Sequence, residues 1–567
     1  MHGSLNFGED LEVNLPQLLA ALRRGQKVIA LGDGSFGVLP EEWLQQYGLL
    51  TSFGVTEEDH LRFQRTQTGV LDALLAARPE ITCDETFARV RKEWQNFAGI
   101  KPVAAPRGFV GKLRDYQREG LGWFKFLQRF NFGGCLADDM GLGKTVQVLA
   151  LLASRRNGES RPSLVVVPRS LIFNWQQEAA RFTPRLRVLT HTGSERIKGH
   201  AHFKDYDLIL TTYGTLRRDV IHFDDVEFDF VILDEAQAIK NAGTETAKAA
   251  RLLKSRQRLA LSGTPIENHL GDLWSLFEFL NPGMLGTASV FQSSTNGTDE
   301  DSRVMLSRAL RPFILRRTKQ QVAKELPEKL EQTIYCEMDE WQRRQYEELR
   351  DYYRQSLFEK VSSQGINKSK FQILEALLRL RQTACHPALV AGSVDDVTPN
   401  AKLDVLLPRL SEVIEESHKA IVFSQFTSFL SIVRRRLDQQ GLLYEYLDGK
   451  THNRRVAVER FQQDPNCKLF LISLKAGGQG LNLTAAEYVF LLDPWWNPAV
   501  EAQAIDRAHR IGQTNRVFAY RLITRDTVEE KVLELQSTKR ELADAIINAD
   551  NSVIRNITGE DLRLLLS

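Results

Sequence analysis

The sequence predicts an α/β protein with two parallel-sheet lobes, an α-helical insertion between them and a small N-terminal accessory region. Three observations support this prediction. Short, unbroken apolar runs alternate with helical segments in two separate stretches of the chain, which is typical of parallel sheets covered by helices on both faces. Between those stretches the pattern changes to long helices. A chain of 567 residues also has room for several domains, at roughly 100–200 residues each.

The first lobe is expected over residues 106–285. Its apolar runs are fully hydrophobic rather than alternating, as in Leu164–Val167, so both faces of the sheet should be buried. The runs that we expect to form strands of this lobe are 135–137, 164–167, 208–211, 230–233 and 258–261.

The insertion is expected over residues 286–395, as helical protrusions and a linker between the lobes. Apolar residues recur every three or four positions in Glu340–Lys360, which predicts a helix, and Phe371–Thr383 is expected to form another. The second lobe should then occupy residues 396–526. Its expected strands are 420–423, 469–472, 489–492 and 517–520.

The two ends of the chain carry weaker patterns. Val28–Leu31 followed by Gly32–Ser35 predicts a strand entering a hairpin turn, within an accessory region of residues 1–105 that we expect to be cut from a longer protein. Helices are expected over 16–24 and 70–77. The segment 527–567 should contain a closing amphipathic brace helix, Thr527–Asn548.

Composition limits the function classes. The chain has 74 basic and 72 acidic residues, for a net charge of +2, which excludes a histone-like basic protein but not a local basic cleft. Its five cysteines form no Cys-x-x-Cys pair, so neither a zinc site nor a disulfide framework is indicated. No apolar run approaches the roughly 20 residues of a membrane helix. We therefore expect a cytoplasmic protein.

The stretch Cys135–Thr145 predicts a phosphate-binding loop. It reads as the end of a buried strand, a Gly-x-Gly-Lys-Thr turn and the start of a helix. Loop N–H groups and the helix N-terminus would face phosphates, Lys144 would neutralise their charge and Thr145 could bind Mg²⁺. Asp138 stands where the general pattern has glycine. Taken alone, the stretch is equally compatible with an ordinary turn.

Asp234 and Glu235 follow the apolar run 230–233. An acidic pair at the carboxyl end of a strand lies where α/β sheets bind ligands. Asp234 could hold Mg²⁺ and Glu235 could orient or deprotonate water. A solvated loop pair is the alternative, and the Gly-x-Gly-Lys-Thr stretch makes the catalytic interpretation the better one.

Arg507 and Arg510 lie three residues apart in the second lobe. On a helix they would share a face, and arginines facing a cleft can stabilise the charge that develops on a γ-phosphate. A surface helix with ion pairs is the alternative. Ser262–Thr264 could sense the same phosphate, although a plain turn explains this stretch equally well.

Taken in order, nine motifs resemble the Swi/Snf-type ATPases, which are superfamily-two, helicase-like DNA translocases with two RecA-like lobes. The resemblance covers about residues 110–540, and Leu492–Pro498 is similar to the bacterial branch. The matching stretches are Leu113–Gln117, Asp138–Thr145, Asp234–Gln237, Leu261–Asn268, Arg316–Lys319, Cys385–Pro387, Val422–Phe426, Lys475–Leu483 and Gln503–Gln513.

The resemblance implies an ATP and Mg²⁺ site. Lys144, Asp234, Glu235, Gln503, Arg507 and Arg510 would be catalytic, and Thr145 and Asp234 would bind the metal ion. The residues implied to bind the nucleotide are Arg114, Gln117, Asp138, Met140, Gly141, Leu142, Gly143, Lys144, Thr145 and Gly480.

It also implies double-stranded DNA as partner, held through its phosphates. DNA-bound proteins such as RNA polymerase would be targets, and the protein would be a monomer associated with the bacterial nucleoid. For Trp496, packing against the core is the alternative to a DNA contact. The implied DNA-contacting residues are Arg169, Ser170, Thr212, Tyr213, Ser424, Gln425, Gly449, Lys450, Lys475, Gly477, Gly478 and Trp496.

The sequence therefore favours a DNA-stimulated ATPase that translocates on duplex DNA without separating the strands. Two rivals stay open. One is a strand-separating helicase, against which Arg316–Lys319 and Cys385–Pro387 argue. The other is a nucleotide-gated DNA-binding module without turnover, against which the complete set of Lys144, Glu235 and the two arginines argues.

Overall fold

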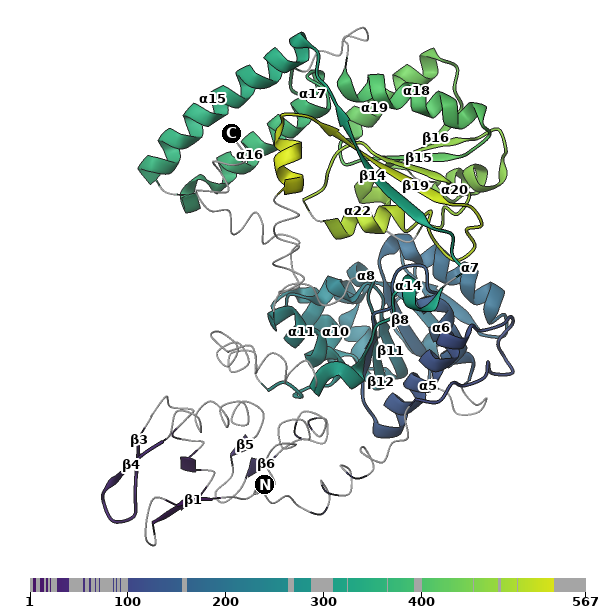
Figure 1. The fold of residues 1–567 in the computed structure, drawn as a ribbon. Coiled ribbons are helices and arrows are strands. Elements are labelled where there is room, and N and C mark those ends of the chain that lie inside the picture. Colours follow the sequence, from purple (N-terminus) through teal and green to yellow (C-terminus); the bar gives the residue numbers. More distant parts are fainter. Residues whose placement is uncertain are drawn as a thin grey trace. The chain divides into compact units, whose positions relative to one another are not determined.

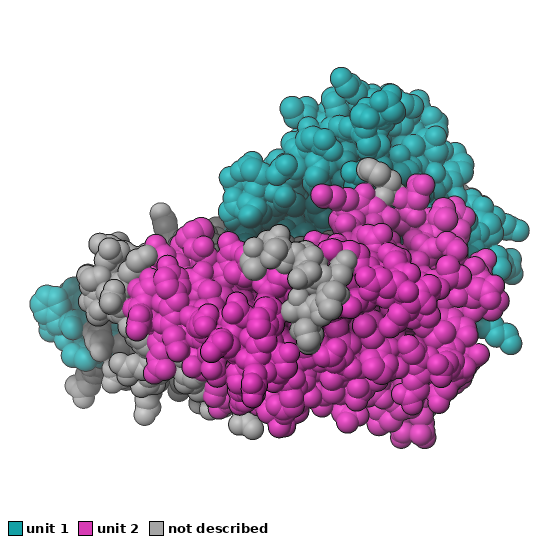
Figure 2. Space-filling model, turned by 90° about the horizontal axis from the view of Figure 1, so that it is seen from above, with its two compact units in different colours: residues 1–139, 143–318 teal, residues 140–142, 319–567 magenta. Residues whose placement is uncertain are grey.

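A computed structural model gives the fold of the chain (Figure 1). It describes short segments between residues 4 and 92, and then residues 100–154, 161–263, 270–286, 309–323, 325–364, 366–391, 400–451, 453–477, 481–496 and 498–534. The chain divides into two compact units, which Figure 2 colours separately. The first contains residues 1–139 and 143–318, and the second contains residues 140–142 and 319–567.

The N-terminal segments include three small antiparallel pairs of strands. These are β1 (Ser4–Asn6) with β2 (Glu12–Asn14), β3 (Val28–Ala30) with β4 (Phe36–Val38), and β5 (Val55–Thr56) with β6 (Leu61–Arg62). The predicted hairpin after Val28 is confirmed. Gly34 supplies the positive φ of 86° that its turn requires. Most of the two helices expected before residue 100 lies outside the described residues.

A seven-stranded sheet forms the centre of the first unit, with the order β13-β7-β12-β11-β8-β10-β9 and every pair parallel. Its strands are β7 (Gly134–Leu136), β8 (Ser163–Val167), β9 (Val188–His191), β10 (Leu208–Thr212), β11 (Glu227–Leu233), β12 (Lys254–Leu261) and β13 (Ile314–Leu315). Each run predicted to be a strand of this lobe coincides with one of them.

Helices cover both faces of this sheet (Figure 1), as the unbroken apolar strands require. The α-helices are α5 (Asp115–Phe130), α6 (Lys144–Ala153), α7 (Ile172–Phe182), α8 (Tyr213–Arg218), α9 (Val220–Asp224), α10 (Glu245–Leu252) and α11 (Leu270–Leu280). In β8, Val165 and Val167 face one core cluster with α5, α6 and α7, whereas Leu164 and Val166 face a second cluster with α8, α9 and α10. The 3₁₀ helices are η2 (Arg169–Leu171), η3 (Ala201–Asp205), η4 (Ala236–Ile239) and η5 (Arg311–Phe313).

The second unit contains a six-stranded parallel sheet with the order β14-β19-β18-β15-β17-β16. Its strands are β14 (Lys329–Cys336), β15 (Ala420–Ser424), β16 (Tyr444–Leu447), β17 (Leu469–Ser473), β18 (Tyr488–Leu491) and β19 (Val517–Thr524). Its helices are α14 (Lys319–Val322), α15 (Glu340–Gln364), α16 (Ile366–Cys385), α17 (Ala388–Ala391), α18 (Ala401–Glu415), α19 (Thr427–Gln439), α20 (Arg454–Gln463), α21 (Leu474–Gly477) and α22 (Pro498–Ile505). The fold class predicted from the sequence is confirmed.

The segment expected to be a helical insertion is more mixed than predicted. The two expected helices are present as α15 and α16, which lie side by side as a long hairpin (Figure 1) and share the core cluster of Tyr346, Leu357 and Leu377. The same segment also contributes β13 to the first sheet and β14 to the second. These strands carry no unbroken apolar run of four residues, because β13 has two residues and β14 has polar residues at Glu331, Gln332 and Thr333.

The helix expected at the C-terminal end begins at Val528, and the residues after Glu534 lie outside the described part. Among the residues that the structure describes, no helix is long and apolar enough to cross a membrane.

Candidate active site

The predicted phosphate loop joins the buried strand β7 to helix α6 in the first unit. Gly141 and Gly143 have φ angles of 88° and 73°, in the left-handed region that favours glycine. The ammonium group of Lys144 donates a hydrogen bond to the backbone oxygen of Asp138 at 2.5 Å, so its side chain folds over the loop. The strand, turn and ten-residue helix together present a helix N-terminus suited to phosphate.

Gln117 lies against this loop at the start of α5. Its side-chain oxygen accepts a hydrogen bond from the backbone N–H of Arg114 at 3.0 Å. A Cβ atom added at Gly143 would come within 2.8 Å of its side-chain nitrogen. The structure therefore brings Gln117 to the phosphate loop, whereas its role toward a base stays a prediction.

Asp138 is turned into the interior of the unit. It is fully buried, and its two carboxylate oxygens accept hydrogen bonds from Nε and Nη2 of Arg317 at 3.0 and 2.6 Å. Gln147 of α6 donates to the same carboxylate at 3.2 Å. The Asp138 side chain therefore anchors the phosphate loop to the interior of the unit. Asp138, which stands where the general pattern has glycine, is paired with Arg317.

Asp234 and Glu235 lie directly after β11, at the carboxyl edge of the sheet that also carries the phosphate loop. One oxygen of Asp234 accepts a hydrogen bond from the indole N–H of Trp175 at 2.8 Å, and the other accepts the backbone N–H of Glu235 at 2.9 Å. Tyr213 donates its hydroxyl to the Asp234 backbone oxygen at 2.7 Å. Glu235 has a φ of 51°, a conformation rare for a non-glycine residue and frequent at functional sites.

Burial, together with the neighbouring charge of Glu235, raises the pKa of Asp234 to about 7. A buried carboxylate beside a second one is poorly stabilised by the protein alone. A divalent cation would stabilise it, so the residues present fit a Mg²⁺ ion held by Asp234 and the hydroxyl of Thr145. The predicted pairing of Asp234 with the phosphate loop on one edge of one sheet is supported by this geometry.

The stretch Ser262–Thr264, which could sense the γ-phosphate, is only partly described by the structure. Ser262 follows β12, and its backbone N–H donates to Leu136 of β7 at 3.2 Å. Residues 264–269 lie outside the described residues.

The predicted arginines lie in the second unit. The expectation that Arg507 and Arg510 share one helix face is wrong, because α22 ends at Ile505 and the following residues form turns. Gln503 is on α22. Arg507 is buried and donates to the backbone oxygen of Leu481 at 3.4 Å. Their approach to a phosphate stays a prediction, and Gly480 lies outside the described residues.

Some residues that the resemblance implies to contact DNA form hydrogen bonds within the first unit. The hydroxyl of Thr212 caps α8 by accepting the N–H of Thr215 at 3.1 Å, and Tyr213 is bonded to Asp234. Arg169 is exposed at the start of η2, two residues after the end of β8. Of these residues, Arg169 is therefore the one whose charged side chain is open to a backbone phosphate.

In the second unit, Ser424 is fully buried and its hydroxyl donates to Asp493. Gly449 and Lys450 are exposed in the turn after β16. The half-buried Trp496 packs on the core of this unit, with the Arg381 guanidinium 5.5 Å from its ring, so core packing accounts for it. Gly478 lies outside the described residues, as do the side-chain surroundings of Lys475 and Gly477.

Two contributing residues were missed by sequence reasoning. Trp175 was given no role, and Arg317 was noted only as part of a motif. Their partners Asp234 and Asp138 are 59 and 179 residues away in the chain, and no local pattern signals such a pairing.

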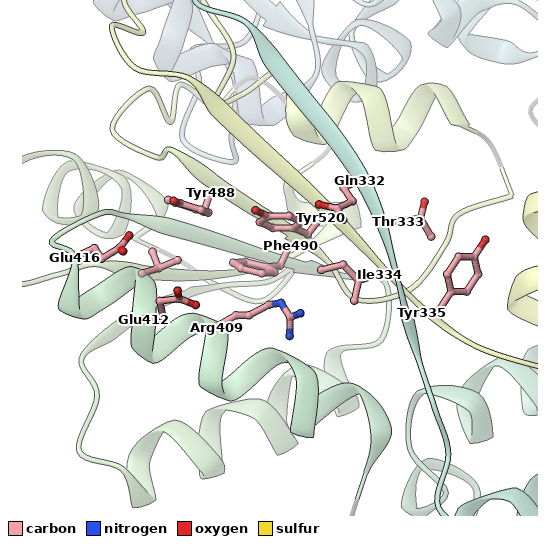
Figure 3. A pocket seen from close by; sticks show the side chains of 11 residues that line it. Gln332, Thr333, Ile334, Tyr335, Arg409, Glu412, Glu416, Tyr488, Phe490 and Tyr520 are labelled. Atoms are coloured by element: carbon pink, nitrogen blue, oxygen red, sulfur yellow. The ribbon is translucent and has the colours of Figure 1, made fainter.

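The second unit also contains a pocket of about 440 Å³ between α18 and the sheet (Figure 3). Arg409 and Glu412 of α18 and Glu416 directly after it line one side, and the rings of Tyr488 and Tyr520 line the other. It contains none of the predicted site residues.

The chain matches two known domain families. The SNF2-related domain matches residues 116–389, and the helicase conserved C-terminal domain matches residues 401–512. The SWI2/SNF2 ATPase core of Sulfolobus solfataricus, solved in complex with dsDNA, is 37% identical, and the match covers 83% of this chain and 99% of that one, with a TM-score of 0.41. This chain belongs to the Swi/Snf-type ATPase family.

Bacterial members of the Swi/Snf family include proteins similar to this chain. A putative ATP-dependent helicase/translocase of Bacillus subtilis, YwqA, is 40% identical over 470 residues, covering 80% of this chain and 50% of that protein. An uncharacterized ATP-dependent helicase of Mycoplasma pneumoniae is 40% identical over 460 residues, covering 80% and 44%. The chain thus spans about half the length of these curated relatives.

Proposed function

We propose that this protein is a DNA-stimulated ATPase that translocates on double-stranded DNA and displaces bound proteins without separating the strands. The observation that supports this most is local to the first unit. The Gly-x-Gly-Lys-Thr loop and the Asp234–Glu235 pair lie at one edge of a single parallel sheet, with Asp234 buried and fixed by Trp175. Such an edge is where parallel α/β sheets bind and turn over nucleotides.

Each residue then has a defined task. Lys144 and the N-terminus of α6 hold the phosphates of ATP, and Thr145 and Asp234 would hold Mg²⁺, which neutralises phosphate charge when bound. Glu235 orients the attacking water and accepts its proton. Gln503, Arg507 and Arg510 of the second unit complete the site when they stabilise the charge that develops on the γ-phosphate.

Duplex DNA is proposed as the track because the Sulfolobus relative, 37% identical, was solved with dsDNA. Backbone amides, short hydroxyls and exposed cations such as Arg169 and Lys450 suit contacts to phosphates, which carry no sequence information. The near-neutral net charge of the chain is compatible with this, since only a local surface must be basic.

The test is ATP turnover with and without nucleic acid for the wild type and Glu235→Gln. Duplex DNA should stimulate the wild type more than single-stranded DNA does. Glu235→Gln should lower kcat by about 100-fold or more, in the range lost with a general base. Glu227→Gln is the matched control, because Glu227 is exposed at the opposite end of the same strand. It should behave like the wild type.

Translocation needs its own assay. Displacement of a third strand from a DNA triplex, without separation of an unmodified duplex, would support translocation. Separation of the duplex would favour a strand-separating helicase instead. Tight ATP binding with no turnover on any nucleic acid would favour a nucleotide-gated binding module and would overturn the proposed function.

A further inference from the structure

The segment Arg316–Lys319 runs beside the phosphate loop and has no task in the proposed function. Its backbone continues the pairing of β13 with β7. The Leu315 oxygen accepts the N–H of Ala137 at 2.8 Å, and the Arg317 oxygen accepts the N–H of Asp139 at 3.0 Å. The first residues of the loop are therefore held directly by this segment.

The side chain of Arg317 adds a second attachment. Its guanidinium is buried and binds both oxygens of Asp138, in the bidentate geometry that fixes direction as well as distance. It also donates to the Gln147 side chain of α6 at 2.9 Å and to the backbone oxygen of Tyr116 in α5. One arginine thus joins the loop to the two helices that flank it.

Lys319, two residues later, is anchored in the second unit. Its ammonium group lies 2.8 Å from a carboxylate oxygen of Asp506 and donates to the backbone oxygen of His509 at 2.5 Å. The side chain is only 10% exposed, so the ion pair is shielded from water and more persistent than a surface pair. Asp506 and His509 flank the segment that contains Arg507 and precedes Arg510.

The division between the two units falls between Thr318 and Lys319. Two residues of extended chain span about 7 Å at most. The attachment to the phosphate loop and the attachment to the arginine segment are therefore joined by a very short tether. We propose that Arg317 and Lys319 are positioning residues that form a strap, through which the state of the phosphate loop sets the position of the arginine segment.

This inference rests on the proposed function for the tasks of Arg507 and Arg510. It also explains Asp138, because a glycine at that position would give Arg317 no carboxylate to bind. In the strap, Arg317 senses the loop through Asp138, and Lys319 transmits the change to Asp506.

The test compares hydrogen exchange of the full chain with and without a non-hydrolysable ATP analogue. In the wild type, the analogue should change exchange in peptides of the phosphate loop and also in peptides covering residues 502–510. Arg317→Lys keeps the charge but loses the bidentate pairing. Lys319→Gln removes the ion pair. Each variant should keep the change at the phosphate loop and lose the change at 502–510.

Matched controls come from the same part of the chain. Arg316→Lys changes an exposed neighbour, and Lys329→Gln changes a lysine whose ion pair with Glu331 lies on β14. Both should respond as the wild type does. In the double variant Arg317→Lys/Lys319→Gln, the change in exchange at 502–510 should equal that in either single variant. The two residues act in series, so losing the second attachment adds no further effect.

The outcomes separate this inference from the proposed function. A wild type without a nucleotide response at 502–510, or single variants that keep it, would overturn the strap whatever the ATPase activity is. Additive losses in the double variant would also overturn it. The wild type could show the nucleotide response at both the phosphate loop and residues 502–510 but no DNA-stimulated ATP turnover. This result would support the strap and would contradict the proposed DNA translocase.

Discussion

The indole N–H of Trp175 in α7 donates a hydrogen bond to a carboxylate oxygen of Asp234 at 2.8 Å, and both side chains are buried. The second oxygen of Asp234 and its backbone oxygen are also bonded, to Glu235 and Tyr213. Trp175 and Glu235 therefore orient the carboxylate itself, and Tyr213 holds the backbone that carries it. Fixed orientation of a ligating carboxylate strengthens metal binding.

The first prediction concerns Trp175. Trp175→Phe keeps an aromatic ring in the core but removes the donor to Asp234. We expect the Mg²⁺ concentration for half-maximal ATP turnover to rise by about 10-fold or more, as for other partners of metal ligands. The measurement is a Mg²⁺ titration at fixed ATP, with nucleotide-free Mn²⁺ binding followed separately.

Trp274→Phe is the control for this experiment. Trp274 lies on α11 of the same unit, and its indole N–H donates to the Gly286 backbone oxygen at 2.9 Å, away from Asp234. It should leave the Mg²⁺ requirement unchanged. Equal shifts in the two variants would mean that Trp175 acts only through packing.

The second prediction follows from the pKa of Asp234, which burial raises from its ordinary value of 3.8 to about 7. Between these values the unfolded carboxyl is ionised while the folded one keeps its proton. The folded state binds more protons, so the stability of the first unit falls as pH rises from about 4 to about 7. Above pH 7 this penalty should stay constant.

Asp234→Asn removes this titration and keeps an oxygen for Trp175. With EDTA present, the thermal midpoint of the variant should fall less than that of the wild type between pH 5 and 7.5. Glu227→Gln, at the start of the strand that Asp234 follows, controls for the loss of one acidic residue. Parallel pH profiles for Asp234→Asn and the wild type would contradict the prediction.

The strands that the sequence predicted share one physical property. A strand buried on both faces, such as Leu164–Val167 in β8, must be apolar at every position, so its pattern is visible in a single sequence. β14 lies at the end of the second sheet, and Glu331, Gln332 and Thr333 interrupt its apolar residues. Because all its side chains except Cys336 are exposed or half-buried, no apolar run of four residues marks it.

The site shows the same division between local and distant information. The phosphate loop and the Asp234–Glu235 pair were predicted because each is a short motif next to a strand. The contact of Trp175 with Asp234 depends on how α7 packs on the sheet, which no local pattern encodes. The sequence also predicted that Arg507 lies on a helix. In the structure α22 ends at Ile505, and Arg507 lies in the turns that follow it.

The third prediction concerns Asn281, which follows α11 and is buried. Its side-chain oxygen accepts the N–H of Gly133 at 2.8 Å, and its nitrogen donates to the Gly133 oxygen at 3.0 Å, directly before β7. Asn281→Ala leaves both backbone groups without these partners, at a cost of about 1–3 kcal/mol. Urea unfolding of the first unit should detect this loss.

The exposed amide pair of Gln257 with Asn131, at 2.9 Å, provides the comparison. Gln257→Ala should change the unfolding free energy by less than about 0.5 kcal/mol, as is usual for surface substitutions. A loss of similar size in both variants would contradict the special role of Asn281.

The fourth prediction concerns an ion pair in the core of the second unit. The ammonium group of Lys402 in α18 lies 2.6 Å from a carboxylate oxygen of Glu529, and both side chains are fully buried. Lys402 also donates to the Leu492 backbone oxygen at 2.6 Å, and Glu529 accepts the N–H of Thr524 at 3.0 Å. The pair therefore ties α18 to the segments after β18 and β19.

Lys402→Met leaves the Glu529 carboxylate buried without its cation, which should destabilise the second unit by about 3–5 kcal/mol. The double variant Lys402→Met/Glu529→Leu removes both charges and should recover most of this loss. The free energy of opening is measured by hydrogen exchange at the amides of β15 and β17.

Lys248→Met, which breaks an exposed pair with Glu245 at 2.8 Å, is the control and should cost no more than about 1 kcal/mol. A double variant less stable than Lys402→Met alone would contradict this account, because the cost would then lie in packing and not in the unpaired charge.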